Sequence, residues 1–314
     1  MPNPTQASPA PASPDTPPRP TGILLPIVMA ALSGICFSFT DMLSKMLAAS
    51  LPALEVAWGR AVMSGLLAAA MLGASGVMSL RHMPRLPLGL LRGLISAVIP
   101  VLAVWSLDLL PMALFTAIIF MSPVLMTVLS VPILGERVGP RRWVAVVVGF
   151  VAVAIIVQPA GEGFGWAVAL PVGCAVLNAF YPILTRLTAP GMSPAALLAF
   201  GPGLAALFLT LAVPFVWVTP SWPDALLLLG CGVVHAFSHL LVVRAYSAAP
   251  ASVLAPFAYV QMPFAVLAGY LAFSELPSTT TIIGGALLVG AGIYIAYREH
   301  TLSRRTSVPS KPKT

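Results

Sequence analysis

Long apolar runs follow one another along most of the chain, separated by short stretches rich in Pro, Gly and polar residues. Each run is about 20 residues long, which at about 1.5 Å per residue is enough to cross the hydrocarbon core of a bilayer. A membrane barrel would instead show alternating segments of about ten residues, so the runs predict helices. The ten expected spans lie near residues 22–44, 53–73, 87–107, 112–133, 142–159, 164–186, 195–217, 223–246, 251–273 and 279–297.

The two ends of the chain are polar. Residues 1–21 are rich in Pro, Ser and Thr, a composition that cannot build a core and predicts a disordered tail. A cleaved signal peptide would begin with a short basic region followed directly by an apolar run, so we expect the first run here to remain as a helix. Residues 299–314 form a second tail, which is basic and polar.

The composition supports a membrane protein. Of the 314 residues, 59% are hydrophobic and 8% are charged, whereas about 25% of a soluble domain is charged. The formal net charge of +7 comes from basic residues spread thinly between apolar runs, which indicates loop orientation rather than nucleic-acid binding. Cys36, Cys174 and Cys231 each lie inside an apolar run without a CxxC pair, so we expect buried thiols and neither a disulfide framework nor a metal site.

The second half of the chain repeats the first. Residues 105–157 align with residues 244–296 at an offset of 139. The earlier part repeats more weakly and at a slightly different offset, with residues 33–45 resembling residues 174–186. The aligned pairs include Pro111 with Pro250, Glu136 with Glu275, and Lys45 with Arg186.

The repeat and the basic residues together predict the orientation of the chain. The repeat divides it into two five-helix units, residues 22–160 and 161–298, and because five is odd the second unit must enter the membrane from the opposite side. With both termini in the cytoplasm, fourteen of the sixteen Lys and Arg residues lie inside, as the positive-inside rule requires. Apart from Lys45 and Arg60, these are Arg19, Arg81, Arg85, Arg92, Arg137, Arg141, Arg142, Arg186, Arg244, Arg298, Arg304, Arg305, Lys311 and Lys313.

Inverted repeats of this kind are typical of secondary transporters, in which two related halves exchange shapes around a site near the membrane midplane. The chain contains no GxxxxGK[ST], GxSxG or HExxH motif. We therefore expect no ATP-driven step, no catalytic residue and no cofactor. A channel, or a membrane-embedded enzyme with catalytic residues clustered at one membrane face, remains an alternative.

Several short stretches carry a family resemblance. They lie at residues 111–113 and 133–137, at the two ends of the fourth span, at 249–276 in the second copy, and at 41–45 and 58–60. Through them the chain, over residues 22–297, resembles the EamA family of the drug/metabolite transporter (DMT) superfamily. The resemblance implies an all-α integral membrane protein of ten transmembrane helices in two inverted five-helix EamA repeats. It also implies a multi-pass protein of the bacterial inner membrane with both termini cytoplasmic.

The sequence is similar to the group within the family that includes riboflavin and S-adenosylmethionine carriers. This implies a secondary transporter that moves a small polar or amphipathic metabolite by alternating access. An exporter of a secreted metabolite, such as a metallophore or an amino acid, is the alternative, because the residues do not assign a direction. The expected partners are the small-molecule substrate, membrane lipid and a proton as coupling ion, with no nucleic acid.

Charged residues near the outer ends of the first two spans form a candidate gate. Asp41 and Lys45 are four residues apart, so they share one helix face. Glu55 and Arg60 lie on the adjoining span, which predicts the pairs Asp41 with Arg60 and Lys45 with Glu55. A charge inside a bilayer costs roughly 2.5–3.5 kcal/mol on insertion scales, so such residues pair or face a cavity. The cluster is therefore either a structural clamp or an outer gate.

His235 and His239 lie near the middle of the eighth span, one helical turn apart. HxxxH spacing can bind a metal, but no acidic partner is evident in that stretch, so we expect none. A hydrogen-bonded pair lining the central cavity is the leading interpretation. Proton coupling is the alternative, because histidine titrates near physiological pH.

Other polar and aromatic residues lie deep in the predicted spans. Amide and ring groups at this depth can bind a polar, ring-containing substrate, or they can join helices by hydrogen bonds. For Trp105 we favour packing, and for Glu136 and Glu275, at equivalent span ends, we favour capping. The candidates for substrate contact are Gln261, Tyr259, Asn178, Tyr181 and Trp105.

Overall fold

The computed structural model of the protein describes residues 24–79, 85–135, 139–157, 165–188, 190, 194–249, 253–254, 257 and 259–306. All regular secondary structure in these ranges is helical. The predicted N-terminal tail lies outside the described residues. The last helix continues to Thr306, so the first part of the polar segment predicted from residue 299 is helical.

Six helical stretches are long and apolar enough, by length and composition, to cross a membrane. Four further apolar helices have shorter apolar stretches, of 10–17 residues. Each of the ten predicted spans therefore contains a described helical stretch, which for span nine is α11 over its second half. The six stretches are α1 (Leu24–Ala48), α2 (Ala53–Ser79), α3 (Leu86–Leu109), α4 (Met112–Ile119) with α5 (Ser122–Leu134), the turn η3 (Gly165–Val168) with α7 (Ala169–Thr188), and α9 (Trp222–Ala248). The other four are α6 (Pro140–Val157), α8 (Pro194–Ala212) with η4 (Val213–Phe215), α11 (Gln261–Phe273) and α12 (Thr279–Thr306).

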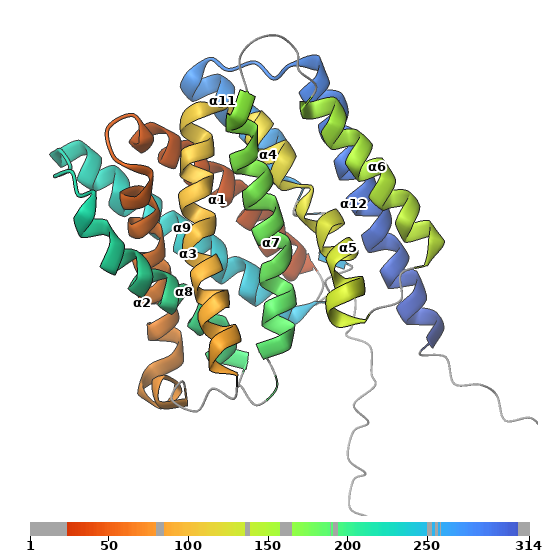
Figure 1. Ribbon diagram of the computed structural model, residues 1–314, viewed down its shortest axis with the longest axis horizontal. Helices are drawn as coiled ribbons and strands as arrows, with labels where there is room; N and C mark the ends of the chain where they lie inside the picture. Colours follow the sequence, from red (N-terminus) through yellow and green to blue (C-terminus); the bar gives the residue numbers. More distant parts are fainter. Residues whose placement is uncertain are drawn as a thin grey trace, which may run out of the picture.

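The helices of the two halves are interleaved. The most extensive helix contacts each join one helix from the first half to one from the second, with α1 against α9, α2 against α8, and α6 against α12. Figure 1 shows α6 and α12 side by side at one edge of the bundle. Neither half forms a separate globule, so a shift of one half against the other changes most of the packing in the molecule.

Both copies of the repeat are broken at the same place. The fourth span is interrupted between α4 and α5, and α5 begins at Ser122. Helix α11 begins at Gln261, 139 residues later, which is the offset of the sequence repeat. Phe120 and Tyr259, which precede the two starts and are equivalent in the repeat, pack edge to face with their ring centroids 5.0 Å apart. The repeat in the sequence therefore corresponds to a repeat in the structure.

The helix ends that follow these breaks also match. Gly135 ends α5 with φ 67°, and its repeat equivalent Ser274 ends α11 with φ 56°. Both residues lie in the left-handed region, which glycine adopts freely and other residues adopt at a cost. At Ser274 the backbone N–H of the next residue, Glu275, donates to the carbonyl of Gly269, which fixes where the Glu275 side chain starts.

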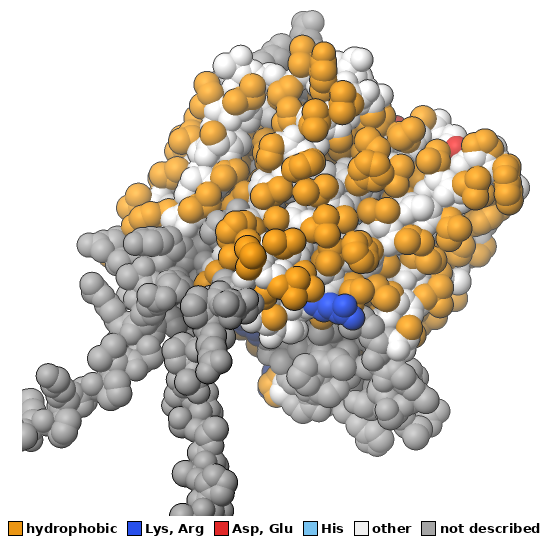
Figure 2. All heavy atoms as spheres, turned by 180° about the vertical axis from the view of Figure 1, so that it is seen from behind, with side chains coloured by type: hydrophobic (Ala, Val, Ile, Leu, Met, Phe, Trp, Pro, Cys, Tyr) orange, Lys and Arg blue, Asp and Glu red, His pale blue; other side chains and the backbone are white. Residues whose placement is uncertain are grey.

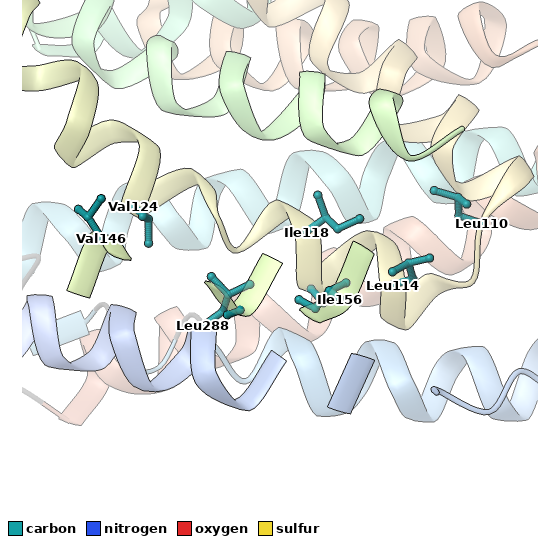
Figure 3. Packing of buried hydrophobic residues seen from close by; sticks show 9 residues of the cluster. Leu110, Leu114, Ile118, Val124, Val146, Ile156 and Leu288 are labelled. Carbon is teal, nitrogen blue, oxygen red and sulfur yellow. The ribbon is translucent and has the colours of Figure 1, made fainter. Parts of the chain in front are cut away.

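Apolar side chains form the core between helices and also cover the outside. Figure 3 shows one core cluster, in which Leu110, Leu114 and Ile118 pack with residues of α5, α6 and α12. On the face seen in Figure 2, apolar side chains predominate and charged ones are few. Phe215 is 87% exposed and Leu271 70% exposed. Such exposure would be unfavourable in water, and it is expected for helices surrounded by lipid.

Substitutions at the two left-handed helix ends should change the stability of the protein in opposite directions. Gly135→Ala should lower the free energy of unfolding by about 1 kcal/mol, because a methyl group there meets no neighbour within 4 Å and only the backbone is strained. Ser274→Gly should raise it by a similar amount. Thermal unfolding of the purified protein in detergent measures both changes, and a lower melting temperature for Ser274→Gly would contradict the assignment.

Candidate functional site

A central cavity of about 900 Å³ lies among the helices. Its volume falls in the range of about 300–1,000 Å³ typical of small-molecule sites. Its lining comes from α1 to α5, α7, α8, α9 and the first residue of α11, and none of the lining residues belongs to α6 or α12. The polar and charged lining residues are Asp41, Arg60, Ser64, Arg92, Ser96, Asn178, Tyr181, Thr185, Arg186, His235, His239 and Gln261.

A charged pair lies at one end of the cavity. Asp41 of α1 and Arg60 of α2 are both buried, with 3.8 Å between the Asp41 Oδ1 and Arg60 Nη2 atoms. The Gln261 side chain donates from Nε2 to the other Asp41 oxygen at 3.3 Å. This cross-helix pair was predicted from the sequence and is confirmed. The structure adds Gln261, so three helices meet at one carboxylate.

Arg60 also joins this pair to the histidines. It donates to the Ser44 hydroxyl at 3.2 Å, and its Nη2 lies 3.5 Å from Nδ1 of His235. Because arginine can only donate, the Nδ1 atom accepts, and a neutral ring carries its proton on Nε2. The His235 and His239 rings are 4.7 Å apart, centroid to centroid, and Phe37 packs against both. Both histidines line the cavity, as predicted.

The break before α11 places Gln261 at the cavity. The Ser38 hydroxyl of α1 donates to the Gln261 carbonyl at 2.8 Å, which anchors the start of α11 to α1. On another buried part of α1, Ser44 donates to the Thr40 carbonyl within its own helix and lies 3.4 Å from the Cys231 thiol of α9. Such bonds leave a helix face with small, internally satisfied polar groups, and they allow α9 to approach closely.

The opposite end of the cavity contains Arg92 and Tyr181. Arg92 of α3 is 2% exposed, and it donates from Nη2 to the Tyr181 hydroxyl of α7 at 2.9 Å. The guanidinium also lies 4.8 Å from the centroid of the Tyr181 ring. Arg92 was counted among the basic residues on the cytoplasmic side, and the structure adds that its side chain is buried within the bundle and does not belong to a loop. Its position inside the predicted span 87–107 was the available signal.

Asn178 lies one helical turn before Tyr181 on α7. Its side-chain amide donates to the Cys174 carbonyl at 3.0 Å, and the residue lines the cavity. Five of the seven predicted substrate or coupling residues therefore surround one space: His235, His239, Gln261, Asn178 and Tyr181. They come from α7, α9 and α11, all in the second half of the chain.

The other two candidates do not line the cavity. Trp105 is 45% exposed and packs edge to face against Trp166, with centroids 6.3 Å apart, so it belongs to the outside of the bundle. Tyr259 is 9% exposed and packs edge to face against Phe120 at the break that precedes α11. Both were predicted from depth alone, which does not specify the direction in which a helix residue points.

The predicted pair of Lys45 with Glu55 is wrong. The Lys45 ammonium lies 2.6 Å from Oε1 of Glu275 and donates to the Leu110 carbonyl at 2.7 Å. Glu55 is fully buried and instead accepts from the backbone N–H of Val218 at 3.1 Å. Sequence reasoning paired neighbours in the first two spans, whereas the interleaved packing brings the second half of the chain to Lys45.

Glu275 has the capping role that was predicted. Its second oxygen accepts from the backbone N–H of Met112, at the free N-terminus of α4, at 3.0 Å. One side chain thus joins α1, the start of α4 and the end of α11. Glu136, its counterpart in the first repeat, lies outside the described residues.

Comparison with protein families and solved structures agrees with this geometry. The profile of the EamA-like transporter family matches residues 24–158 and again residues 165–298. A solved crystal structure has the same fold, with a TM-score of 0.60 at 19% identity over 92% of this chain and 100% of the other.

Named relatives are transporters. A riboflavin transporter of Vibrio cholerae is 34% identical over 60% of this chain, and the match spans 64% of that protein, just under two thirds of its length. An S-adenosylmethionine uptake transporter of Rickettsia prowazekii is 26% identical over 85% of this chain and 94% of its own. The pseudopaline exporter CntI of Pseudomonas aeruginosa is 28% identical over 86% and 95%, respectively.

The contact of Lys45 with Glu275 can be measured by a double-mutant cycle. We expect Lys45→Met and Glu275→Gln to show a coupling free energy of about 1–2 kcal/mol, because the pair is mostly shielded from solvent and satisfies two helix ends. Unfolding by denaturant in mixed micelles provides the free energies. The matched control is the cycle of Lys45→Met with Glu55→Gln, for which we expect a coupling near zero. Equal coupling in the two cycles would contradict the observed pairing.

Proposed function

The chain belongs to the EamA-like transporter family, and on that premise we propose that it is a secondary carrier that moves a small polar or amphipathic metabolite by alternating access through the central cavity. The observation that carries this proposal is the cavity itself. Its 900 Å³ volume fits one small metabolite, and polar side chains of both halves of the chain face it. A membrane-embedded enzyme or a channel is the alternative that the experiment below separates.

The substrate is proposed to contact the cavity-lining candidates. His235, His239 and Gln261 lie beside the Asp41–Arg60 pair, while Asn178 and Tyr181 line the α7 side. Rings and amides at these places can stack against and hydrogen-bond a planar, polar molecule. The similarity to riboflavin and S-adenosylmethionine transporters makes a riboflavin- or S-adenosylmethionine-like substrate the first proposal. Export of a secreted metabolite is the second, favoured by the similarity to the pseudopaline exporter.

Alternating access requires that each end of the cavity opens in turn. The contacts of Lys45 with Glu275 and with the Leu110 carbonyl join the two halves beyond the Asp41 end of the cavity. We assign them the role of an outer gate that is closed in this conformation. The repeat aligns Lys45 with Arg186, which lines the opposite end. A rocking motion of the two interleaved halves would exchange the roles of the two ends.

A proton is the proposed coupling ion. Asp41, Arg60 and His235 form one contact network inside the bundle, so a proton gained by either the carboxylate or the imidazole changes the charge that Arg60 balances. The affinity for a substrate that binds beside this network would then depend on whether the proton is bound. Coupling of this kind needs no cofactor and no ATP.

We further propose ten membrane spans in two repeats, residues 22–160 and 161–298, in the bacterial inner membrane with both termini cytoplasmic. The ten helical stretches at the expected positions support the number of spans. The loop between α11 and α12 contains no basic residue, whereas its counterpart in the first repeat contains Arg137 and is followed by Arg141 and Arg142 at the start of α6, which supports the orientation.

Transport in proteoliposomes tests the carrier function. A panel of metabolites that includes riboflavin and S-adenosylmethionine should show saturable flux of at least one member, driven by an imposed pH gradient. Arg60→Ala should lower this flux by at least about tenfold, because it leaves Asp41 buried without its cation. Arg244→Ala, which removes an exposed arginine of α9, should leave the flux unchanged.

The same assay separates the alternatives. Flux that does not saturate would indicate a channel, and chemical conversion of a panel member would indicate an enzyme. His235→Gln and His239→Gln keep hydrogen-bonding capacity but do not titrate, so at least one should alter the dependence of flux on pH. Wild-type pH dependence in both variants would remove these histidines from coupling, with protein abundance matched in every comparison.

Labelling of single cysteines tests the orientation. A cysteine at Ser278, in a variant whose three native cysteines are replaced by alanine, should react in whole cells with a thiol reagent that cannot cross the inner membrane. The reason is that Ser278 precedes α12 in the loop assigned to the outside. Reaction with permeant reagents alone would reverse the proposed orientation.

A further inference from the structure

Two buried arginines face the cavity from different helices, Arg60 of α2 and Arg92 of α3, and Asp41 is the carboxylate among the described lining residues. Asp41 is engaged by Arg60 and Gln261 at one end. The end of the cavity at Arg92 therefore holds positive charge with no carboxylate among the described lining residues there. In a site of low dielectric such an excess attracts an anion strongly.

Arg92 is far from the compensated pair. It precedes Leu110, whose carbonyl binds Lys45, by eighteen residues on α3, which is roughly 27 Å along the axis at 1.5 Å per residue. Asp41, by contrast, lies a single helical turn before Lys45 on α1. The two arginine-containing ends of the cavity are therefore separate, and Asp41 does not neutralise Arg92.

The Arg92 side chain is buried with part of its bonding capacity unused. Its Nη2 donates to Tyr181, but its Nε and Nη1 atoms have no hydrogen-bond partner in the described part of the protein. A guanidinium carries five N–H donors and is always protonated, so it must remain charged there. Leaving a buried charged donor unpaired is unfavourable, whereas a charge-assisted bond to an oxyanion would be strong.

The surroundings hold the Arg92 and Tyr181 side chains in place. A Cβ at Gly201 of α8 would collide with the Tyr181 hydroxyl, and one at Gly93 would collide with Leu204. Glycine at both points lets α3, α7 and α8 approach closely enough to fix the tyrosine against the guanidinium. The phenol hydroxyl also remains able to donate, because it accepts from Arg92. Arg92 and Tyr181 thus line the cavity side by side.

We propose that the Arg92–Tyr181 end of the cavity, called here the anion subsite, binds a carboxylate or phosphate group of the transported metabolite; this inference rests on the proposed carrier function. Arg92 and the Tyr181 hydroxyl, which both line this end, contact the oxyanion. The remainder of the molecule extends toward His235 and Gln261. The substrate is then anionic or zwitterionic, with its acidic group at the α7 side.

Inorganic phosphate is the probe for the subsite. Thermal unfolding of the purified protein in neutral detergent is measured with sodium phosphate and with sodium chloride at matched ionic strength. Phosphate should raise the melting temperature of the wild type by at least about 2 °C over chloride, since a ligand that binds only the folded state stabilises it. Arg92→Met should abolish the difference, Arg92→Lys should keep part of it, and Arg244→Met should keep all of it.

Stability without anion distinguishes a binding role from a structural one. If Arg92 serves the subsite, Arg92→Met in chloride should unfold at the wild-type temperature or above, because an apolar side chain replaces an uncompensated buried charge. A marked fall in melting temperature would make Arg92 a structural residue and overturn the proposal. Equal effects of phosphate and chloride on the wild type would overturn it as well.

Two further arms identify the source of the anion and separate this inference from the carrier function. The melting temperature is also measured with phosphatidylglycerol added to the detergent, and with phosphatidylcholine as the control. Phosphate should still raise the melting temperature in the presence of phosphatidylglycerol. If phosphatidylglycerol removes the effect of phosphate, the subsite binds a lipid headgroup and the proposal fails. In proteoliposomes, Arg92→Met should raise the KM of the carried metabolite about tenfold or more. An unchanged KM in Arg92→Met with intact flux would contradict the anion subsite but not the carrier function. If the wild type binds phosphate but transports no member of the panel, the carrier function is contradicted.

Discussion

A buried charge inside a membrane protein is stabilised by counter-groups of the protein or of a bound ligand, because lipid supplies none. This constraint organises the interior of the bundle. Asp41 faces Arg60 and Gln261, and Lys45 faces Glu275 and the Leu110 carbonyl. Each network joins a residue of α1 to a residue at one end of α11, Gln261 at its start and Glu275 just after its last residue, and these helices lie in opposite halves of the chain. The charges therefore join the halves, and they do so next to the cavity where a substrate would bind.

The interleaved packing follows from the repeat. When two related units enter the membrane in opposite orientations, the helices of one can pack against those of the other, as α1 does with α9 and α6 with α12. The breaks before Ser122 and Gln261 occur at equivalent positions and leave polar backbone beside the cavity, where it can be satisfied. Phe120 and Tyr259, which lie at the two breaks, pack against each other. Helices α6 and α12 contribute no lining residue and lie together at one edge, which suits a supporting role.

Arg92 and Lys45 show how much of the candidate site could be predicted from the sequence. Hydropathy and helical spacing predicted cavity-lining positions for His235 and His239, because polar residues in mid-span must avoid lipid. The same reasoning gave Gln261, Asn178 and Tyr181 as candidates for substrate contact, and the structure shows that all five line one cavity. Depth alone placed Trp105 and Tyr259 with them, and their rings pack elsewhere. The count of basic residues grouped Arg92 with the loop charges because Arg92 lies near the end of a span. Such a count does not consider which face of the helix a residue occupies.

By itself the sequence determined the helical class, the positions of the apolar stretches, the repeat and the nearness of Asp41 to Arg60. Each of these depends on local composition, on periodicity or on the packing of consecutive helices, and all are contained in a linear pattern. Only the tertiary structure decided that Lys45 pairs with Glu275, that Glu55 is held by the Val218 backbone, and that Arg92 faces Tyr181. These contacts join residues 89–230 positions apart. The rotation of each helix and the interleaving of the halves bring them together, and both result from the packing of all the helices at once.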